Sequence, residues 1–433
     1  MKTQPLPGFR DFYPDDLALR SHIFRTWRTV ATRYGFEEYD GPPLEPLDLY
    51  TAKSGDEIVG QLYNFSDKGD REVALRPEMT PSLARMVAAR AGQLKKPIRW
   101  FSIPQLFRYE RQQRGRLREH FQLNCDLIGE ASPLADAEII ALAIDVMRGF
   151  GLGPNDVRVR LSDRRLLTAI LQSRGVPEVG MSKAFECIDK IERLRKDQLD
   201  QLYAGSQALG KATIADLQEI ARIRGWDMLE SHLGAVPGLT KTAEPLRHTY
   251  TALESMGLGS FVDIDLTIVR GLAYYTGVVF ELFDSGRSLR AICGGGRYDN
   301  LLSAVGGVEL PAVGFGMGDV VLAELLKDRS LVPTDVSSID VFIAFITKDD
   351  VAYVLAVAHQ LRDAGLRVEY ALSPQAVGKQ LNLADARHAR LAVVVGPDER
   401  TRGEIVIKDL RSGSQETIPL LKTVEIIRAR VNG

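Results

Sequence analysis

The feature that most restricts how this chain can fold is a pair of strand-like stretches with polar side chains on one face. FRYE at 107–110 and HFQLNCDLIG at 120–129 flank an Arg-rich segment, which indicates a hairpin with a long loop. Alternate residues of a strand point to the same side, and four polar residues share one parity: Arg108, Glu110, Gln122 and Asp126. Apolar side chains normally fill such positions. The pattern predicts an antiparallel sheet whose polar face binds a ligand, although a charged run taken alone is more often a solvated surface.

A second stretch, VRGLAYYTGVVFELF at 269–283, has the apolar and β-branched content of a strand but carries Arg270 at its start. It also contains two adjacent tyrosines, Tyr274 and Tyr275. Neighbouring strand residues point to opposite faces, so both tyrosines can enter one cavity only if the strand is bulged or lies at the cavity's rim. Otherwise one of them packs in the core, and an ordinary half-buried strand is the alternative for this stretch by itself.

Two glycine-rich segments follow. RAICGGGRYDNLL at 290–302 contains Gly294–Gly296, and PAVGFGMGDVVL at 311–322 has glycines at 314, 316 and 318 before an apolar helix. Glycine lets a backbone approach a ligand closely, and a plain turn at the end of a strand is an equal alternative for the first segment. The second segment does not spell G-x-G-x-x-G and follows no βαβ unit, so the sequence predicts no dinucleotide site there.

The N-terminal part predicts an amphipathic helix followed by short strands. Leu19, Ile23, Trp27, Val30 and Ala31 recur at helical spacing, and a glycine at 35 is placed to end the helix. The later segment LRPEMTPSLARMVAAR passes from a strand into another helix, which places Glu78 and Thr80 at a junction where side chains can face a cleft. An N-cap is the alternative role for Thr80.

Composition and chain organisation bound the class of protein. With 433 residues the chain is long enough for about three domains, and its net charge of -2 excludes a globally basic surface, so nucleic acid would need local basic patches. Residues from about 162 to 256 are helical and charged, a linker follows at about 327–338, and the remainder alternates strands and helices. The three cysteines lie far apart, and no apolar run of about 18 residues occurs, which predicts a cytoplasmic protein without a membrane span.

The order of these motifs resembles the histidyl-tRNA synthetase family of class II aminoacyl-tRNA synthetases over nearly the whole chain. The shared strings are PPLE, LRPEMT, FRYERQQRGR, HFQLNCDLIG, VRGLAYYTGVVFE and AICGGGRYD. The resemblance implies an α+β catalytic domain at 1–328 with an antiparallel sheet and a helical insertion at about 166–256, followed by an α/β anticodon-binding domain at 339–433. It also implies a homodimer built partly through the PPLE region.

The resemblance further implies the substrates and the residues that hold them. The substrates are L-histidine, ATP, Mg²⁺ with the ATP, and the tRNA that accepts histidine, with no metal held by protein side chains. Arg108 and Arg270 would hold the α-phosphate as catalytic residues. The other implied ATP contacts are Glu110 and Arg116. The implied histidine contacts are Glu78, Thr80, Gln122, Asp126, Tyr274 and Tyr275, with Asp126 and Tyr275 reading the imidazole. Gln113 and Arg114 would contact the tRNA acceptor end.

The chain departs from the family pattern in three places. Ala273 stands where the family usually has Asp, and Asp126 where it often has Glu. Val321 stands at the motif 3 arginine that contacts the γ-phosphate in the family. The string around Tyr274 also occurs in a non-catalytic relative, the histidine-sensing regulatory subunit of ATP phosphoribosyltransferase. A C-terminal domain and an intact Arg108 and Arg270 favour the ligase over that alternative.

Overall fold

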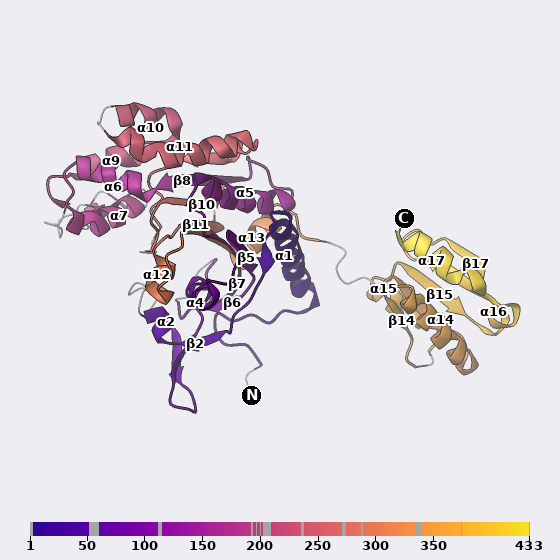
Figure 1. The fold of residues 1–433 in the computed structure, drawn as a ribbon. Helices are drawn as coiled ribbons and strands as arrows, with labels where there is room; N and C mark the ends of the chain where they lie inside the picture. Colours follow the sequence, from indigo (N-terminus) through magenta and orange to yellow (C-terminus); the bar gives the residue numbers. More distant parts are fainter. Residues whose placement is uncertain are drawn as a thin grey trace. The chain divides into compact units, whose positions relative to one another are not determined.

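A computed structural model of the chain describes residues 3–51, 60–110, 115–191, 194–195, 197–199, 201, 209–234, 238–270, 274–286, 289–333, 339–373 and 375–432. They form two compact units (Figure 1). The first comprises Leu19–Val332 with the N-terminal residues up to Asp11, and the second comprises Pro333–Gly433 with Phe12–Ala18.

The first unit is built around a large sheet. Among the described residues it has nine strands, in the order β1-β5-β7-β12-β11-β10-β8-β9, with β6 paired to β7. The strands are β1 (Glu37–Glu38), β5 (Ile98–Ser102), β6 (Gln105–Phe107), β7 (Glu119–Ile128), β8 (Val157–Asp163), β9 (Val262–Ile264), β10 (Val278–Asp284), β11 (Cys293–Arg297) and β12 (Ala312–Gly318). The central pairs are antiparallel, as predicted, and only β1 with β5 and β8 with β9 run parallel. The predicted hairpin is β6 and β7, in which Leu106 pairs with His120.

Helices cover the sheet on both faces. They are α1 (Pro14–Arg33), α2 (Asp48–Thr51), α4 (Thr80–Arg90), α5 (Pro133–Gly149), α12 (Leu301–Gly306) and α13 (Asp319–Asp328). The predicted apolar stripe of α1 is buried against the same core as α5, with Trp27 fully buried. On β7 the odd-numbered Leu123, Cys125 and Leu127 enter this core. The even-numbered positions therefore face the opposite side of the sheet, where α4 and α12 pack.

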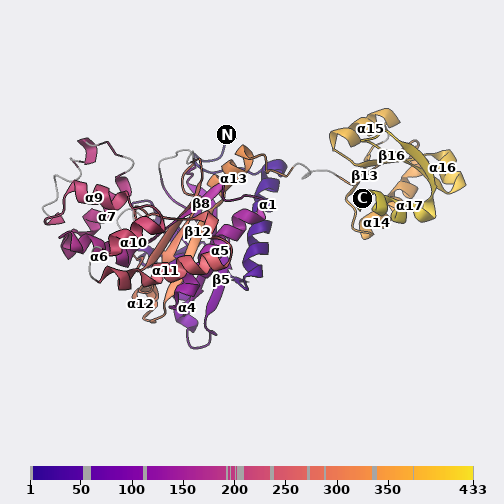
Figure 2. The same cartoon turned by 90° about the horizontal axis from the view of Figure 1, so that it is seen from above.

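A group of helices is inserted between β8 and β9. It contains α6 (Arg164–Ser173), α7 (Met181–Lys190), α9 (Ile214–Ala221), α10 (Gly225–Gly234) and α11 (Leu239–Ser255). Figure 2 shows α11 beside α5, and the two helices are in contact. Leu166 of α6, Leu229 of α10 and Leu253 of α11 belong to the same buried cluster as Trp27, so the inserted helices share their core with the large sheet.

A smaller three-stranded sheet contacts α2, which in turn contacts α4. Its order is β2-β4-β3, from β2 (Leu44–Pro46), β3 (Tyr63–Ser66) and β4 (Glu72–Leu75), all antiparallel. A turn at 67–70 joins β3 to β4, and the carboxylate of Asp67 accepts hydrogen bonds from the backbone N–H groups of Gly69 and Arg71. Large apolar side chains remain exposed on this sheet, with Leu44 at 37% and Phe65 at 49%.

The second unit alternates strands and helices as predicted. Its sheet order is β14-β13-β15-β16-β17, with β13 parallel to β14 and β15 and the last two pairs antiparallel. The strands are β13 (Val341–Phe345), β14 (Val368–Tyr370), β15 (Leu391–Val395), β16 (Glu404–Asp409) and β17 (Gln415–Pro419). The helices are α14 (Val351–Asp363), α15 (Val377–Ala386), α16 (Pro397–Arg402) and α17 (Thr423–Asn432). The strands β13 and β15 are apolar throughout because helices cover them.

The strand predicted over 269–283 is wrong in its first half. The strand β10 begins at Val278, and Tyr274 and Tyr275 precede it in irregular structure. Arg270 has a φ of 57°, a left-handed conformation that a strand does not permit. The opposite-face rule therefore does not apply to the two tyrosines, since it holds only within a strand.

The alternative of a strand-end turn at Gly294–Gly296 is also wrong, because these glycines lie inside β11. At the end of this strand, Arg297 is 2% exposed and its Nε donates to the Asp136 carboxylate at the start of α5 at 2.9 Å. Removing one partner of such a buried pair typically costs about 3–5 kcal/mol of folding free energy. Arg297 thus holds the sheet to α5.

Candidate active site

Two adjoining cavities open on the polar face of the large sheet. The larger has a volume of about 740 Å³ and the smaller about 180 Å³. Both are lined by five residues: Arg108, Gln122, Arg270, Gly294 and Gly316. The predicted face of polar residues therefore forms one continuous site, and Arg108 and Arg270 lie where its two cavities adjoin.

The smaller cavity is lined mainly by hydroxyl, carboxyl and amide groups. It brings together all six residues predicted to bind histidine, namely Glu78, Thr80, Gln122, Asp126, Tyr274 and Tyr275. Tyr274 Oη donates to Glu78 Oε2 at 3.4 Å, and the two tyrosine rings lie 5.1 Å apart. Both tyrosines line the cavity because their segment is irregular. The alternative role of Thr80 as an N-cap is wrong, since Met79 occupies the cap position of α4.

Asp126 and Glu78 are the buried carboxyl groups among the described residues that line this cavity. Tyr298, which sequence reasoning did not include in the site, donates a hydrogen bond to Asp126 Oδ1. Burial raises the pKa of Asp126 to about 7, against the opposing effect of the Tyr298 hydrogen bond. A carboxyl whose pKa lies near 7 can exchange its proton when a ligand arrives.

Glycines on β11 and β12, which carry no side chain, leave room for the residues of the site. A Cβ atom added to Gly314 would overlap the Asp126 carboxylate, and one added to Gly294 would overlap the Arg270 guanidinium. A Cβ on Gly316 would lie 2.6 Å from Gln122 Nε2. The sequence predicted that these glycines let a ligand approach the backbone closely. In the structure, the side chains of Asp126, Arg270 and Gln122 lie against them.

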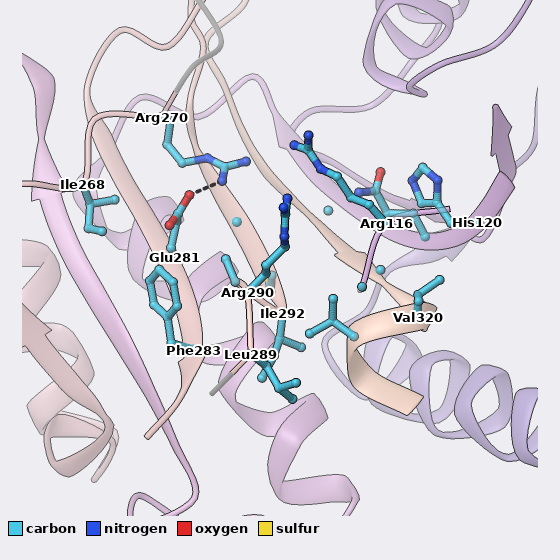
Figure 3. A pocket seen from close by; sticks show the side chains of 18 of the residues that line it. Arg116, His120, Ile268, Arg270, Glu281, Phe283, Leu289, Arg290, Ile292 and Val320 are labelled. Atoms are coloured by element: carbon cyan, nitrogen blue, oxygen red, sulfur yellow. Dashed lines mark hydrogen bonds and ion pairs between the residues drawn. The ribbon is translucent and has the colours of Figure 1, made fainter. Parts of the chain in front are cut away.

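The larger cavity is lined by arginines and fewer carboxylates (Figure 3). The arginines are Arg108, Arg116, Arg160, Arg270 and Arg290, and the acidic residues are Glu110, Asp189 and Glu281. Arg116 Nη1 lies 2.9 Å from Glu110 Oε2, and Arg160 Nη1 lies 3.2 Å from Asp265 Oδ2. The cavity therefore carries an excess of positive charge, which suits an anionic ligand.

Arg270 is held in place by Glu281 of β10. The two form an ion pair, and Glu281 is the register partner of Gly294, over which the guanidinium lies. Burial acts to lower the pKa of Arg270, but Tyr275 and Glu281 outweigh it and raise that pKa. Arg270 is therefore a permanent cation with a fixed direction.

Two site residues were missed by sequence reasoning although they share the parity that revealed Gln122. His120 lines the larger cavity and Asn124 the smaller, both from β7. Burial, together with Arg108 and other nearby arginines, lowers the pKa of His120 to about 3. His120 is thus a neutral aromatic ring at pH 7. Extending the alternation from Gln122 in both directions would have found both residues.

The start of α13 differs from what the family pattern implies. Val321 lines the larger cavity with an aliphatic side chain. Asp319 is buried and does not line either cavity. Its carboxylate pairs with Arg10 Nη1 at 2.9 Å and accepts a hydrogen bond from the backbone N–H of Phe121 at 2.9 Å. The residues Arg111, Gln112, Gln113, Arg114 and Ala273 lie outside the described part of the chain.

The described residues contain no group of three or more His, Cys, Asp and Glu side chains placed to hold a metal ion. Within the same residues, no helix has the length and apolar character needed to span a membrane.

Comparison with known proteins places the whole chain in one family. The family model described as histidyl-tRNA synthetase matches residues 8–319, and that described as anticodon binding domain matches residues 340–430. Histidine–tRNA ligase of Opitutus terrae is 44% identical over 427 residues, which cover 98% of each chain. The chloroplastic/mitochondrial histidine–tRNA ligase of Arabidopsis thaliana is 40% identical over 418 residues, covering 96% of this chain and 85% of the relative.

Solved structures agree with the sequence relatives. The crystal structure of histidyl-tRNA synthetase from Nostoc sp. PCC 7120 superposes with a TM-score of 0.85 at 26% identity, covering 99% of this chain and 100% of that chain. The match extends over both units and includes the strands that carry the two cavities. The chain belongs to the histidyl-tRNA synthetase family.

Proposed function

We propose that the two cavities catalyse the ATP-dependent ligation of L-histidine to its tRNA through a histidyl-adenylate. The observation that carries the proposal is that Arg108 and Arg270 line both cavities. Histidine in the smaller cavity and ATP in the larger would meet at these two guanidinium groups. A carboxylate oxygen of histidine attacks the α-phosphorus there, and pyrophosphate leaves.

The smaller cavity suits histidine in size and in hydrogen-bonding groups. Neutral imidazole has one donor and one acceptor, and Asp126 with Tyr275 supplies one group for each. Glu78 and Gln122 offer oxygens to the α-ammonium group, with Thr80 and Tyr274 beside them. Leu or Phe would leave these buried groups without partners, which rejects them by about 10⁴ or more.

The larger cavity suits ATP, entering as its Mg²⁺ complex. Glu110 and Glu281 line this cavity and would supply carboxylate oxygens to the Mg²⁺ of the complex. Arg108 and Arg270 flank the α-phosphate, where negative charge grows in the transition state. Arg116 extends toward the remaining phosphates. His120 presents an uncharged ring on which a purine can stack.

The remaining parts of the chain complete the enzyme. Residues 1–328, with the helical insertion at about 166–256, form the catalytic domain, and residues 339–433 bind the anticodon. Gln113 and Arg114 contact the acceptor end, whose terminal hydroxyl attacks the histidyl carbonyl and releases AMP. The regulatory alternative is less favoured, because the anticodon-binding model matches residues 340–430.

We further propose a cytoplasmic homodimer. The small sheet exposes Leu44 and Phe65, large apolar side chains that a second copy would cover. The three cysteines, Cys125, Cys187 and Cys293, are free and buried, which fits a reducing compartment.

Histidine-dependent exchange of labelled pyrophosphate into ATP tests the first reaction, and charging of tRNA tests the second. The ligase requires both. Exchange without charging, or histidine binding without exchange, would favour the histidine-sensing alternative. Leucine and phenylalanine serve as matched controls for the smaller cavity.

A further inference from the structure

The distal phosphates of ATP need a cation that the start of α13 does not supply. Val321 lines the larger cavity there, and Asp319 is buried with Arg10. A triphosphate carries its charge along its whole length, and the pyrophosphate that leaves gains charge as the bond breaks. Another group in the cavity must meet that charge.

The arginines of the larger cavity differ in their positions and in their neighbours. Arg108 and Arg270 border the smaller cavity and face the α-phosphate. Arg160 is paired with Asp265 and stacks on the Phe283 ring, with Cζ 5.0 Å from the ring centroid. Arg116, Arg160 and Arg290 line only the larger cavity, and Arg116 Nη1 lies 2.9 Å from Glu110 Oε2.

Arg290 lies beside the position that Val321 leaves open. A Cβ atom placed on Gly115 would lie 3.3 Å from Val321 Cγ2 and 3.9 Å from Arg290 Cδ. The two side chains therefore flank one point of the wall. Figure 3 shows Arg290 extending into the cavity between Arg270 and Arg116. Its guanidinium extends from there into the larger cavity, which Val321 also lines.

We propose that Arg290 binds the β- and γ-phosphates of ATP and stabilises the leaving pyrophosphate. Arg290 lies in the segment just before β11, whereas Val321 lies in α13, so the charge reaches the cavity from another part of the chain. A guanidinium suits this task because its planar fork binds two phosphate oxygens at once. The inference rests on the proposed ATP-dependent function of the cavity.

The experiment compares wild type, Arg290→Ala, Arg290→Lys and the double variant Arg290→Ala, Val321→Arg in pyrophosphate exchange. We expect Arg290→Ala to lower kcat/KM for ATP by about 10², the effect of removing one charge-stabilising donor, with the KM for histidine unchanged. Arg290→Lys should recover only part, since lysine lacks the fork. Val321→Arg in the alanine background should restore at least tenfold, because it returns an arginine to the same space.

Binding of a non-reactive histidyl-adenylate analogue, histidyl-sulfamoyl adenosine, provides the internal control. It lacks the β- and γ-phosphates, so calorimetry should give the same affinity for wild type and Arg290→Ala. Equal losses for ATP and the analogue, or exchange by Arg290→Ala at the wild-type rate, would overturn the role of Arg290. Wild-type protein that shows no histidine-dependent exchange would instead overturn the proposed function, independently of Arg290.

Discussion

The two cavities share lining residues, but in the proposed function they recognise their ligands by different kinds of interaction. The smaller one encloses about 180 Å³ and is lined by tyrosines, amides and two buried carboxyls, of which Asp126 has its pKa raised to about 7. The larger one encloses about 740 Å³ and is lined by arginines, two of which are paired with cavity carboxylates. Hydrogen bonds in the first are directional and tolerate little change. Charge attraction in the second acts over longer distances.

The difference explains which departures from the family pattern the chain can accept. Aspartate in place of glutamate at Asp126 keeps the same chemical group, and Gly314 leaves room for it. At the larger cavity, valine at position 321 carries no charge, and in our proposal Arg290 supplies one from the segment before β11. A charge requirement can be met from several directions, whereas a hydrogen-bond requirement is met from one.

The largest effect is expected at the boundary between the cavities. Arg270→Ala should lower histidine-dependent pyrophosphate exchange by about 10² to 10³, because Arg270 meets charge that grows only in the transition state. Histidine should still bind, which calorimetry without ATP measures. A variant that binds no histidine would assign Arg270 to the smaller cavity and remove the distinction drawn between the two.

The hairpin loop should separate a third ligand from both cavities. The double variant Gln113→Ala, Arg114→Ala is expected to lose tRNA charging by about 10² or more, as two contacts of roughly 1–3 kcal/mol each are removed. Pyrophosphate exchange should stay within a few-fold of wild type, and charging should become less sensitive to salt. A parallel fall in exchange would place the loop in the ATP site.

Asp126→Ala tests the directional character of the smaller cavity. Losing a hydrogen bond to a charged group costs about 1.5–3 kcal/mol, so the KM for histidine should rise about 10- to 100-fold while that for ATP stays unchanged. Tyr298→Phe is the matched control, because it keeps the ring and removes only the hydrogen bond to Asp126. Equal effects on both substrates would mean that Asp126 holds the sheet together instead of reading the ring.

The smallest effect concerns pH. Burial raises the pKa of Asp126 to about 7, so its contribution to folding stability is present at acid pH and lost as pH rises through 7. Histidine binding has the opposite sign, because a ring N–H needs the ionised carboxylate as acceptor. Histidine affinity should therefore increase by roughly tenfold or more from about pH 6 to about pH 7.5.

Calorimetry at the two pH values checks this with Asp126→Asn as the control. The variant keeps only the dependence that comes from the imidazole of histidine, so its curve should be flatter. Identical curves for the two proteins would show that Asp126 does not change its protonation when histidine binds.

Local periodicity in the sequence predicted many of the helices and strands. Alternation along β7 placed Gln122 and Asp126 on one face, and helical spacing placed Trp27 in the core of α1, because each pattern depends on a few neighbouring residues. The alternation of strands and helices in the second unit was predicted for the same reason. The motif order then identified the family and, with it, the six residues that the smaller cavity brings together.

Only the tertiary structure decided which distant segments meet. The order β7-β12-β11-β10 sets Gly314 against Asp126 and Gly294 against Glu281, and no local pattern contains that order. The irregular segment before Val278 lets both tyrosines line one cavity. The segment before β11 brings Arg290 close to Val321. Neighbours in sequence determine periodicity, whereas the packing of the whole sheet determines which side chains from different strands share a cavity.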